Sequence, residues 1–190
     1  MRSVLTLALG GLMLAGAASA EGGDPEAGRK VANMCRTCHG LNGYAEIPIA
    51  PHIGGEPADY LSAQLLAFKS GARAHEMMTV VASGLTETQI ADVAAWYAAQ
   101  TAIASLAADP ALAPETCSGC HGVDGIAVID GAPNLAGETN IYIETQLKAF
   151  REGRRENPIM SGIAADLSNE EMRALADWYA AVSLEITPPE

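Results

Sequence analysis

Two pentapeptides in this chain share an arrangement that indicates specific chemistry: two cysteines are separated by two residues, and the second is followed at once by histidine. They are Cys35-Arg36-Thr37-Cys38-His39 and Cys117-Ser118-Gly119-Cys120-His121. This pattern is the signature for covalent attachment of a c-type haem. We therefore predict two haem c groups, one bonded to each pair of cysteines: Cys35 with Cys38, and Cys117 with Cys120.

Other cysteine chemistries fit the pattern less well. Four cysteines in an exported protein first suggest two disulfides, but here each pair leads directly into a histidine. A zinc ribbon usually brings its two cysteine pairs within about 15–20 residues of each other, and Cys38 and Cys117 lie much further apart. A thioredoxin-like motif needs a surrounding βαβ pattern, which is not visible. Haem attachment is therefore favoured over these three alternatives.

The two halves of the sequence are copies of one unit. A shift of 82 positions, which carries Cys35 onto Cys117, aligns them without a gap. Identical pairs beyond the cysteine motifs include Pro51 and Pro133, Glu56 and Glu138, Tyr60 and Tyr142, Gln64 and Gln146, Arg73 and Arg155, Met78 and Met160, and Trp96 and Trp178. Two long copies indicate two similar domains and not a solenoid, which needs shorter and more numerous units.

The chain divides into a leader and two domains, at residues 1–20, 21–104 and 105–190. Prolines within residues 100–114 interrupt helix and mark the connection between the domains. Because this linker is short, we expect the domains to pack against each other.

The leader has the three parts of a secretory signal peptide. Arg2 supplies a positive start, Val4 to Leu14 is an apolar run, and Ala18-Ser19-Ala20 is a small-residue cleavage site. We predict cleavage after Ala20 and a periplasmic product. No later apolar run is long enough to span a bilayer, so no transmembrane span is expected in the mature chain.

Each unit is expected to be all-α. A helix should begin at Asp24-Pro25, an N-cap followed by proline in the first turn, and run into the first cysteine motif. In the second unit Asp109-Pro110 stands closer to Cys117, which predicts a shorter and irregular front helix. No sustained strand pattern is visible.

Two further helices follow each motif after a loop rich in glycine and proline. An amphipathic helix is predicted from about Ala58 to Ser70, ended by Gly71. The last helix of each unit should begin with a capping box, formed by Thr86 with Gln89 and by Ser168 with Glu171.

Histidine and methionine are the expected axial ligands of each iron. His39 and His121 are held beside the metal by the covalent attachment. A methionine thioether suits the opposite face because it favours reduced iron. Met78 and Met160 each lie 39 residues after their histidine, which selects them. Met77 stands beside Met78 and remains an alternative.

Other polar residues near the ligands have less certain roles. Arg73 and Arg155 recur five residues before the ligand methionines, and arginine is suited to bind the haem propionates. The alternative is a solvated arginine paired with a nearby glutamate. The remaining histidines, His52 and His75, are expected to be polar residues of the surface or of loops.

The charge of the chain limits its partners. Carboxylates dominate, with a formal net charge of −12, so a nucleic-acid role is excluded. The excess of acids is larger in residues 105–190, with 14 acids against 5 bases, than in residues 21–104, with 9 against 5. A redox partner with a basic docking surface is therefore expected.

Together these features resemble the dihaem cytochrome c4 type. The resemblance covers nearly all of the mature chain, and its most specific parts, each with a second-half counterpart, are Cys35-x-x-Cys38-His39-Gly40, Pro51-x-x-Gly54-Gly55, Tyr60-x-x-x-Gln64-Leu65, Met78-Thr79 and Ala94-x-Trp96-Tyr97. It implies two tandem class I cytochrome c domains related by a pseudo-twofold axis, His/Met ligation in both, and a periplasmic electron carrier. The chain is also similar to the cytochrome subunit of flavocytochrome c sulfide dehydrogenase.

Single-electron transfer between redox partners is the function that these expectations favour. An iron with six protein and porphyrin ligands has no open position for a substrate, so catalysis is not expected. The alternative is an electron-accepting subunit of a periplasmic dehydrogenase complex, such as a flavocytochrome c sulfide dehydrogenase. Direct enzymatic action, as in dihaem peroxidases or thiosulfate-oxidising cytochromes, needs a vacant or displaceable site or a cysteine ligand. It is disfavoured, because both halves offer a methionine and no cysteine remains beyond the four attachment residues.

Overall fold

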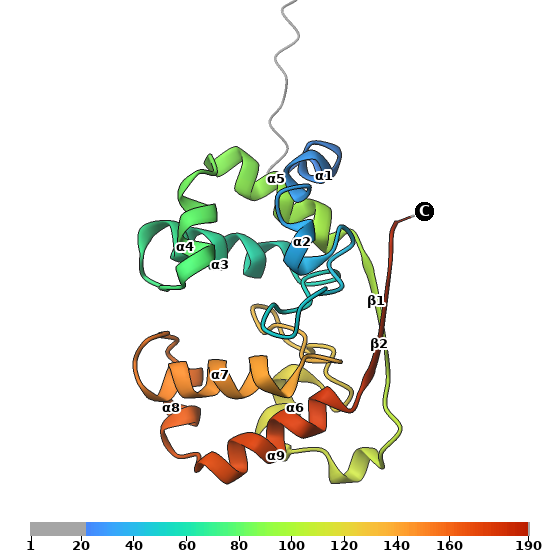
Figure 1. Cartoon of the computed structure of the whole chain (residues 1–190). Coiled ribbons are helices and arrows are strands. Elements are labelled where there is room, and N and C mark those ends of the chain that lie inside the picture. Colours follow the sequence, from blue (N-terminus) through green and yellow to red (C-terminus); the bar gives the residue numbers. More distant parts are fainter. Residues whose placement is uncertain (1–21, 190) are drawn as a thin grey trace, which may run out of the picture.

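The computed structural model describes residues 22–189, so the expected signal peptide at residues 1–20 lies outside the described part. Two helical halves are stacked one above the other, and a two-stranded ribbon runs along one side of both (Figure 1). The expected all-α fold in two similar domains is confirmed, apart from this ribbon. Within residues 22–189 no helix is both long and apolar enough to cross a bilayer.

Corresponding helices build the two halves. The N-terminal half contains α1 (Pro25–Ala32), α2 (Arg36–His39), α3 (Ala58–Ser70), α4 (Glu76–Ser83) and α5 (Glu87–Ala98). The C-terminal half contains a short 3-10 helix η1 (Pro110–Leu112), then α6 (Glu115–His121), α7 (Asn140–Arg151), α8 (Met160–Ala165) and α9 (Asn169–Ala180). The front of the second unit is short and irregular, as its prolines predict.

The predicted helix starts and the end at Gly71 are confirmed, but the front helix does not run into the first cysteine motif: α1 ends at Ala32, and the separate helix α2 begins at Arg36. Asp24 caps α1, with its Oδ1 atom accepting from the backbone N–H of Glu26 at 2.9 Å. Gly71 ends α3 in the left-handed conformation. Both capping boxes are formed: Thr86 with Gln89 at the start of α5, and Ser168 with Glu171 at the start of α9.

Each half has its own small core. In the N-terminal half α1 crosses α5 closely. Glycine at position 28 permits this approach, because a Cβ atom there would lie only 1.9 Å from the carbonyl oxygen of Asp92. In the C-terminal half α7 packs on α9, and Met172 is fully buried between them. Domains of about this size bury a limited apolar surface, so these cores alone supply modest stability.

The ribbon was not expected from the sequence. Strand β1 (Thr101–Ser105) leaves the first domain and pairs antiparallel with β2 (Ser183–Thr187), which leaves the second. The prediction of no strands is therefore wrong. Each segment is short and has its pairing partner in the other copy, so local periodicity carried little signal. The central pair, Ile103 and Glu185, joins equivalent positions of the repeat, so the ribbon lies on a pseudo-twofold axis.

Reciprocal hydrogen bonds join the two domains about the same axis. His52 Nε2 lies 3.1 Å from the carbonyl oxygen of Gly137, and Asn134 Nδ2 donates to the equivalent carbonyl of Gly55 at 3.0 Å. His52 is only 8% exposed. The expectation of a surface or loop residue is confirmed as far as the loop is concerned, since His52 lies in the loop before α3, but the residue is buried and not on the surface. Its equivalence to Asn134 gave no sign that both side chains cross the interface.

Hydrogen bonds also fix the tautomer of His52. The backbone N–H of Ala45 donates to Nδ1 at 2.9 Å, so Nδ1 carries no proton and the proton on Nε2 points to Gly137. Asn134 does the same with its amide, since Oδ1 accepts from Ala127 at 2.9 Å. Burial lowers the pKa of His52, so the interface needs the neutral imidazole.

We predict that His52→Asn reduces the loss of stability in acid. The pKa of His52 in the folded protein lies below the ordinary value of 6.5, so the unfolded chain binds the proton more readily and stability falls as pH drops through that value. Urea unfolding at about pH 7 and about pH 5 measures the effect. Equal pH dependence in the wild type and the variant would contradict this account of the interface.

A buried tyrosine fixes the backbone that follows each cysteine motif. Tyr97 donates its hydroxyl proton to the carbonyl oxygen of Gly40, and Tyr179 donates to that of Gly122, both at 3.2 Å. Burial raises the pKa of both hydroxyl groups, so they stay protonated as donors. The two bonds connect the last helix of each domain to the residue after the motif histidine.

We predict that Tyr179→Phe destabilises the protein by about 1 kcal/mol, because it leaves a buried carbonyl without its donor. Tyr97→Phe should cost a similar amount, since the two hydrogen bonds are equivalent. Chemical unfolding measures both. A loss confined to one of the two variants would show that the equivalent bonds do not play equal roles.

Candidate haem-binding sites

Short helices position the residues of both motifs. His39 is the last residue of α2, and His121 is the last residue of α6. The four cysteine thiols are half-buried and unpaired. Within residues 22–189 no three His, Cys, Asp or Glu side chains come together as a metal site, so the donors for a zinc ribbon are not assembled.

Each motif histidine is oriented by a backbone carbonyl. His39 Nδ1 lies 2.9 Å from the oxygen of Pro51, and His121 Nδ1 lies 2.8 Å from the oxygen of Pro133. A carbonyl only accepts, so Nδ1 carries the proton and Nε2 keeps a lone pair. Burial lowers the pKa of both imidazoles, which favours the neutral form that binds iron. The repeated prolines were visible in the sequence, but their role as acceptors was not identified.

In the second domain the predicted haem residues meet at one cavity. Its volume is about 720 Å³, and its lining includes Cys117, Cys120, His121 and Met160. Apolar side chains from α7 and the preceding loop complete the wall: Leu135, Ile143, Leu147 and Phe150. A large apolar cavity with a free imidazole nitrogen, a thioether and two thiols fits a covalently attached haem.

The methionines differ in exposure. Met160 and Met78 are half-buried in α8 and α4, whereas Met77 is 64% exposed. The two methionine helices start alike. His75 Nδ1 accepts from the backbone N–H of Met78 at 3.3 Å, and Asn157 Oδ1 accepts from that of Met160 at 2.9 Å. His75 is thus an exposed helix cap, in agreement with a surface role.

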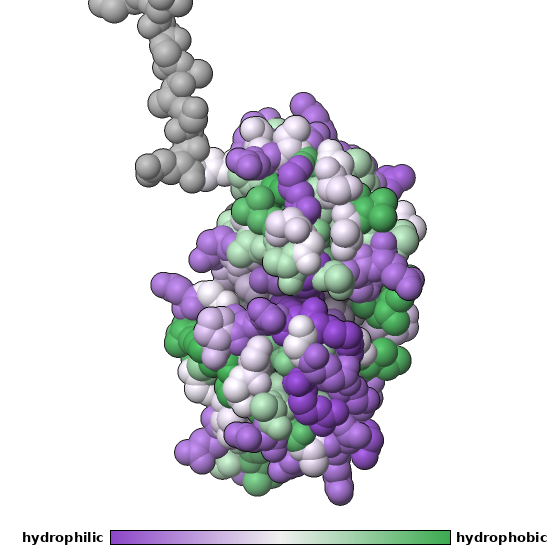
Figure 2. Space-filling view, turned by 90° about the vertical axis from the view of Figure 1, so that its left-hand side faces the viewer, coloured by the Kyte–Doolittle hydropathy of each residue, from purple (hydrophilic) through white to green (hydrophobic). Residues whose placement is uncertain are grey.

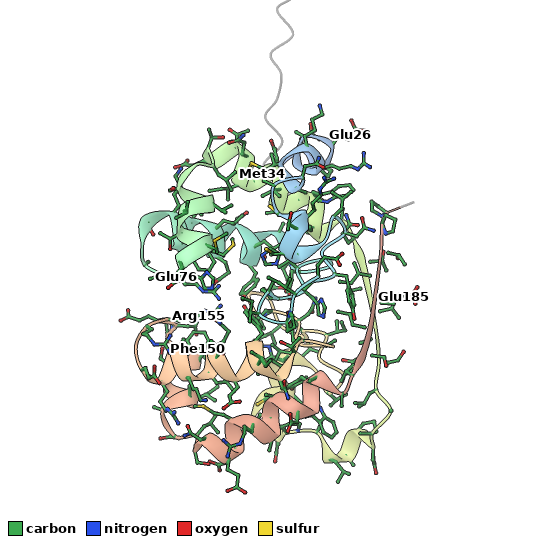
Figure 3. The ribbon with its side chains drawn as sticks, in the orientation of Figure 1. Glu26, Met34, Glu76, Phe150, Arg155 and Glu185 are labelled. Carbon is green, nitrogen blue, oxygen red and sulfur yellow. The ribbon has the colours of Figure 1, made fainter. Side chains whose placement is uncertain are left out.

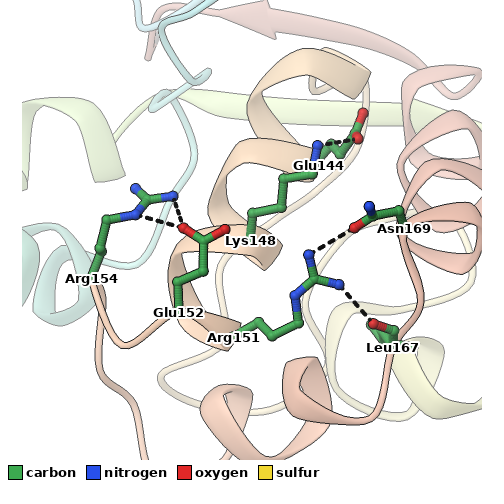
Figure 4. A network of polar contacts seen from close by, with 7 residues as sticks. All are labelled: Glu144, Lys148, Arg151, Glu152, Arg154, Leu167 and Asn169. Atoms are coloured by element: carbon green, nitrogen blue, oxygen red, sulfur yellow. Dashed lines mark hydrogen bonds and ion pairs between the residues drawn. The ribbon is translucent and has the colours of Figure 1, made fainter.

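Polar contacts connect the end of α7 to α9 and so hold the segment that carries Met160 (Figure 4). Arg151 donates to the carbonyl oxygen of Leu167 at 3.0 Å and to Oδ1 of Asn169 at 2.7 Å. In the first domain Lys69, equivalent to Arg151, donates to the carbonyl oxygen of Leu85. In both domains, therefore, a basic residue near the end of the helix before the methionine helix bonds the backbone just after the methionine helix.

Arg73 and Arg155 lie between the domains and form a reciprocal network. Arg73 donates at 2.7 Å to Oε1 of Gln64 in its own domain and to Oε1 of Gln146 in the other. Arg155 donates to Gln146 at 2.9 Å and to Gln64 at 3.0 Å. Within the described chain neither arginine has a carboxylate within ion-pair distance, so the alternative of a glutamate partner is not supported.

Aromatic groups complete this network. The hydroxyl of Tyr60 accepts from Arg155 at 3.1 Å, and burial raises the pKa of Tyr60 to about 12. Figure 3 shows Arg155 and Phe150 on the side of the second domain that faces the first. The guanidinium carbon lies 4.5 Å from the centre of the Phe150 ring. Both arginines also line the 720 Å³ cavity, as do both glutamines.

Comparison with known proteins agrees with this geometry. The family model described as cytochrome c matches residues 25–99 and again 110–182. Cytochrome c4 of Thiocapsa roseopersicina is 38% identical over 188 residues, which cover 88% of this chain and 97% of that protein. The thiosulfate dehydrogenase electron acceptor of Thiomonas intermedia is 32% identical, with 98% of this chain and 94% of that protein covered.

A solved structure shows the same architecture. Reduced recombinant cytochrome c4 from Pseudomonas stutzeri superposes with a TM-score of 0.74 at 32% identity, covering 85% of this chain and all of that chain. The two family matches each contain one Cys-x-x-Cys-His motif. The chain therefore belongs to the cytochrome c family, as a two-domain, dihaem electron carrier of the cytochrome c4 type.

Proposed function

We propose that this carrier works in the periplasm, where it moves single electrons between redox proteins and performs no chemistry on a small molecule. The observation that carries the proposal is the pair of repeat-equivalent imidazoles, each with Nδ1 bound to a proline carbonyl and Nε2 available as a ligand. The signal-peptide pattern that ends at Ala20 supports the location.

Different residues attach the cofactor and ligate its iron. When bound, haem supplies a reversible one-electron change between ferrous and ferric iron. We assign covalent attachment to the four motif cysteines and axial ligation to His39 with Met78 and to His121 with Met160. With both protein ligands of each iron supplied by the chain, no position would remain for a substrate, which supports transfer without catalysis.

Two further assignments belong to this proposal. Residues 21–104 and 105–190 form the two domains, an assignment supported by the family matches on either side of the connection. Arg73 and Arg155 contact haem propionates, because their half-buried guanidinium groups line the cavity and arginine is well suited to carboxylates.

The partner should present a basic surface. Hydrophilic side chains gather densely on the lower half of Figure 2, which is the C-terminal domain. That half also carries the larger excess of acids, with 14 against 5 bases in residues 105–190. Complementary charge speeds the encounter of redox proteins that bind weakly.

Oxidation of the reduced protein by small charged complexes tests the sign of this field. We predict that tris(1,10-phenanthroline)cobalt(III), a cationic oxidant, reacts more slowly as ionic strength rises, because salt screens its attraction to the acidic surface. Oxidation by ferricyanide, an anion, should become faster under the same change. Stopped-flow absorbance measures both rates. If both rates respond to salt in the same direction, an acidic docking surface is contradicted.

A second candidate is an electron-accepting subunit of a dehydrogenase complex. The relative from Thiomonas intermedia is named for accepting electrons from thiosulfate dehydrogenase, and it matches nearly the whole chain. Purification of the native protein distinguishes the two. A fixed ratio to a dehydrogenase supports the subunit, whereas an isolated chain that still reduces an oxidase supports the free carrier.

We predict that Met160→Ala removes the thioether-to-iron absorption band contributed by the second domain of the oxidised protein, because the ligand sulfur is lost. Absorption spectra of the oxidised protein before and after the substitution measure the change. The first domain should keep its band through Met78.

Met172→Leu is the matched control, because Met172 is fully buried in the same core and leucine conserves its volume. It should leave the band unchanged. Met77→Leu should likewise have no effect, since Met77 is largely exposed. Loss of the band in either control, or an unchanged band in Met160→Ala, would show that the ligands are assigned to the wrong residues.

A further inference from the structure

Two glutamates are buried where the domains meet, and electron transfer as described does not use them. Glu56 and Glu138 are equivalent in the repeat and are 5% and 3% exposed. Both line the 720 Å³ cavity that also holds His121 and Met160. Carboxyl groups are almost never this buried without a charged partner.

The surroundings of the pair favour neutral carboxyl groups. Glu56 Oε2 accepts one hydrogen bond, from the backbone N–H of Asn134 in the other domain, at 3.0 Å. Glu138 Oε2 is buried and has no hydrogen-bond partner. Within the described residues neither carboxyl forms an ion pair. An ionised carboxylate in such a place loses its hydration with little return.

The two groups also influence each other. Burial raises the pKa of Glu56 to about 8. Burial also raises the pKa of Glu138 and a charge on Glu56 raises it further, while the backbone N–H groups of His52 and Thr139 lower it without cancelling the rise. Two like charges in one apolar region disfavour each other, so the pair readily holds at least one proton near neutral pH.

We propose that the Glu56–Glu138 pair takes up a proton when an electron enters the neighbouring haem site and releases it when the electron leaves. This inference rests on the proposed function. An added electron makes the region more negative, and a nearby negative charge favours the protonated carboxyl. By linkage, a proton on the pair makes the electron easier to accept.

The balance of the step is simple. A reduced redox partner supplies one electron, and solvent supplies one proton, which forms an O–H bond on a carboxylate oxygen of the pair. On oxidation the electron passes to the next partner, the O–H bond breaks and the proton returns to water. The exposed Asp130 and Glu156 line the same cavity, so the cavity reaches the surface from which protons come.

Other titratable or charged groups face this region and must be separated from the pair. They are His52 from the loop before α3, Asp59 and Tyr60 from α3, Tyr142 from α7, and Arg73 and Arg155 from the loops after α3 and α7. His52 is fixed as a neutral donor by Ala45, and Tyr60 titrates only near pH 12. Substituting the glutamates one at a time therefore isolates their contribution.

Redox titration of the purified dihaem protein between about pH 6 and pH 9, a range that brackets the raised glutamate pKa, tests the proposal. We expect at least one midpoint potential to fall as pH rises. Glu138→Gln and Glu56→Gln should reduce this dependence, because the amide has nearly the same shape and cannot take up the proton. Glu185→Gln, an exposed change of equal charge on β2, should keep it.

An infrared measurement on the wild type does not depend on how the variants fold. The reduced-minus-oxidised spectrum should show a protonated carboxyl band that shifts when the protein contains ¹³C-labelled glutamate. The proposal would be overturned if the midpoint potentials did not change with pH, or if both glutamine variants kept the same pH dependence as the wild type. A carboxyl band that does not shift with ¹³C-labelled glutamate would overturn it as well. If the proposed function were wrong because the protein binds no haem, no haem potential would be measured at all. That result differs from a haem potential that is measured but does not change with pH, which would contradict only the role of the glutamate pair.

Discussion

The rest of the structure depends on a hydrogen bond from each motif imidazole to a proline carbonyl. It holds His39 and His121 in one tautomer and leaves Nε2 free, while burial keeps the rings neutral. Metal-binding histidines need such an outer partner to set their orientation and basicity. Because the acceptors lie in the loops after the motifs, these loops must be packed in place, and the buried tyrosines of α5 and α9 bond the same regions. Each small domain is thus organised around its ligand.

The interface repeats one set of contacts twice. The ribbon of β1 and β2, the crossed hydrogen bonds of His52 and Asn134, and the arginine–glutamine network all obey the same pseudo-twofold relation. An interface of this isologous kind brings equivalent surfaces of the two domains together. It places the 720 Å³ cavity of the second domain against groups from the first, including Gln64 and Arg73. Polar groups from both domains therefore meet at one cavity.

The sequence predicted what is encoded locally. The cysteine motifs, the helix caps at Asp24, Thr86 and Ser168, and the register of the repeat all depend on near neighbours or on one fixed spacing. It did not predict the ribbon or the burial of His52, because both depend on contacts between the copies. His52 and Asn134 show the reason: different side chains make the same two hydrogen bonds, and nothing in either residue type indicates an interface. The acceptor role of Pro51 was hidden in the same way, since a backbone carbonyl has no signature in the sequence.

Mass spectrometry of the mature protein, with peptide mapping of its cysteines, tests the central claim most directly. The account predicts two added haem groups per chain, with thioether bonds at Cys35, Cys38, Cys117 and Cys120 and an N-terminus at Glu21. A chain without added porphyrin, or with the same four sulfurs joined to one another as disulfides, would contradict it.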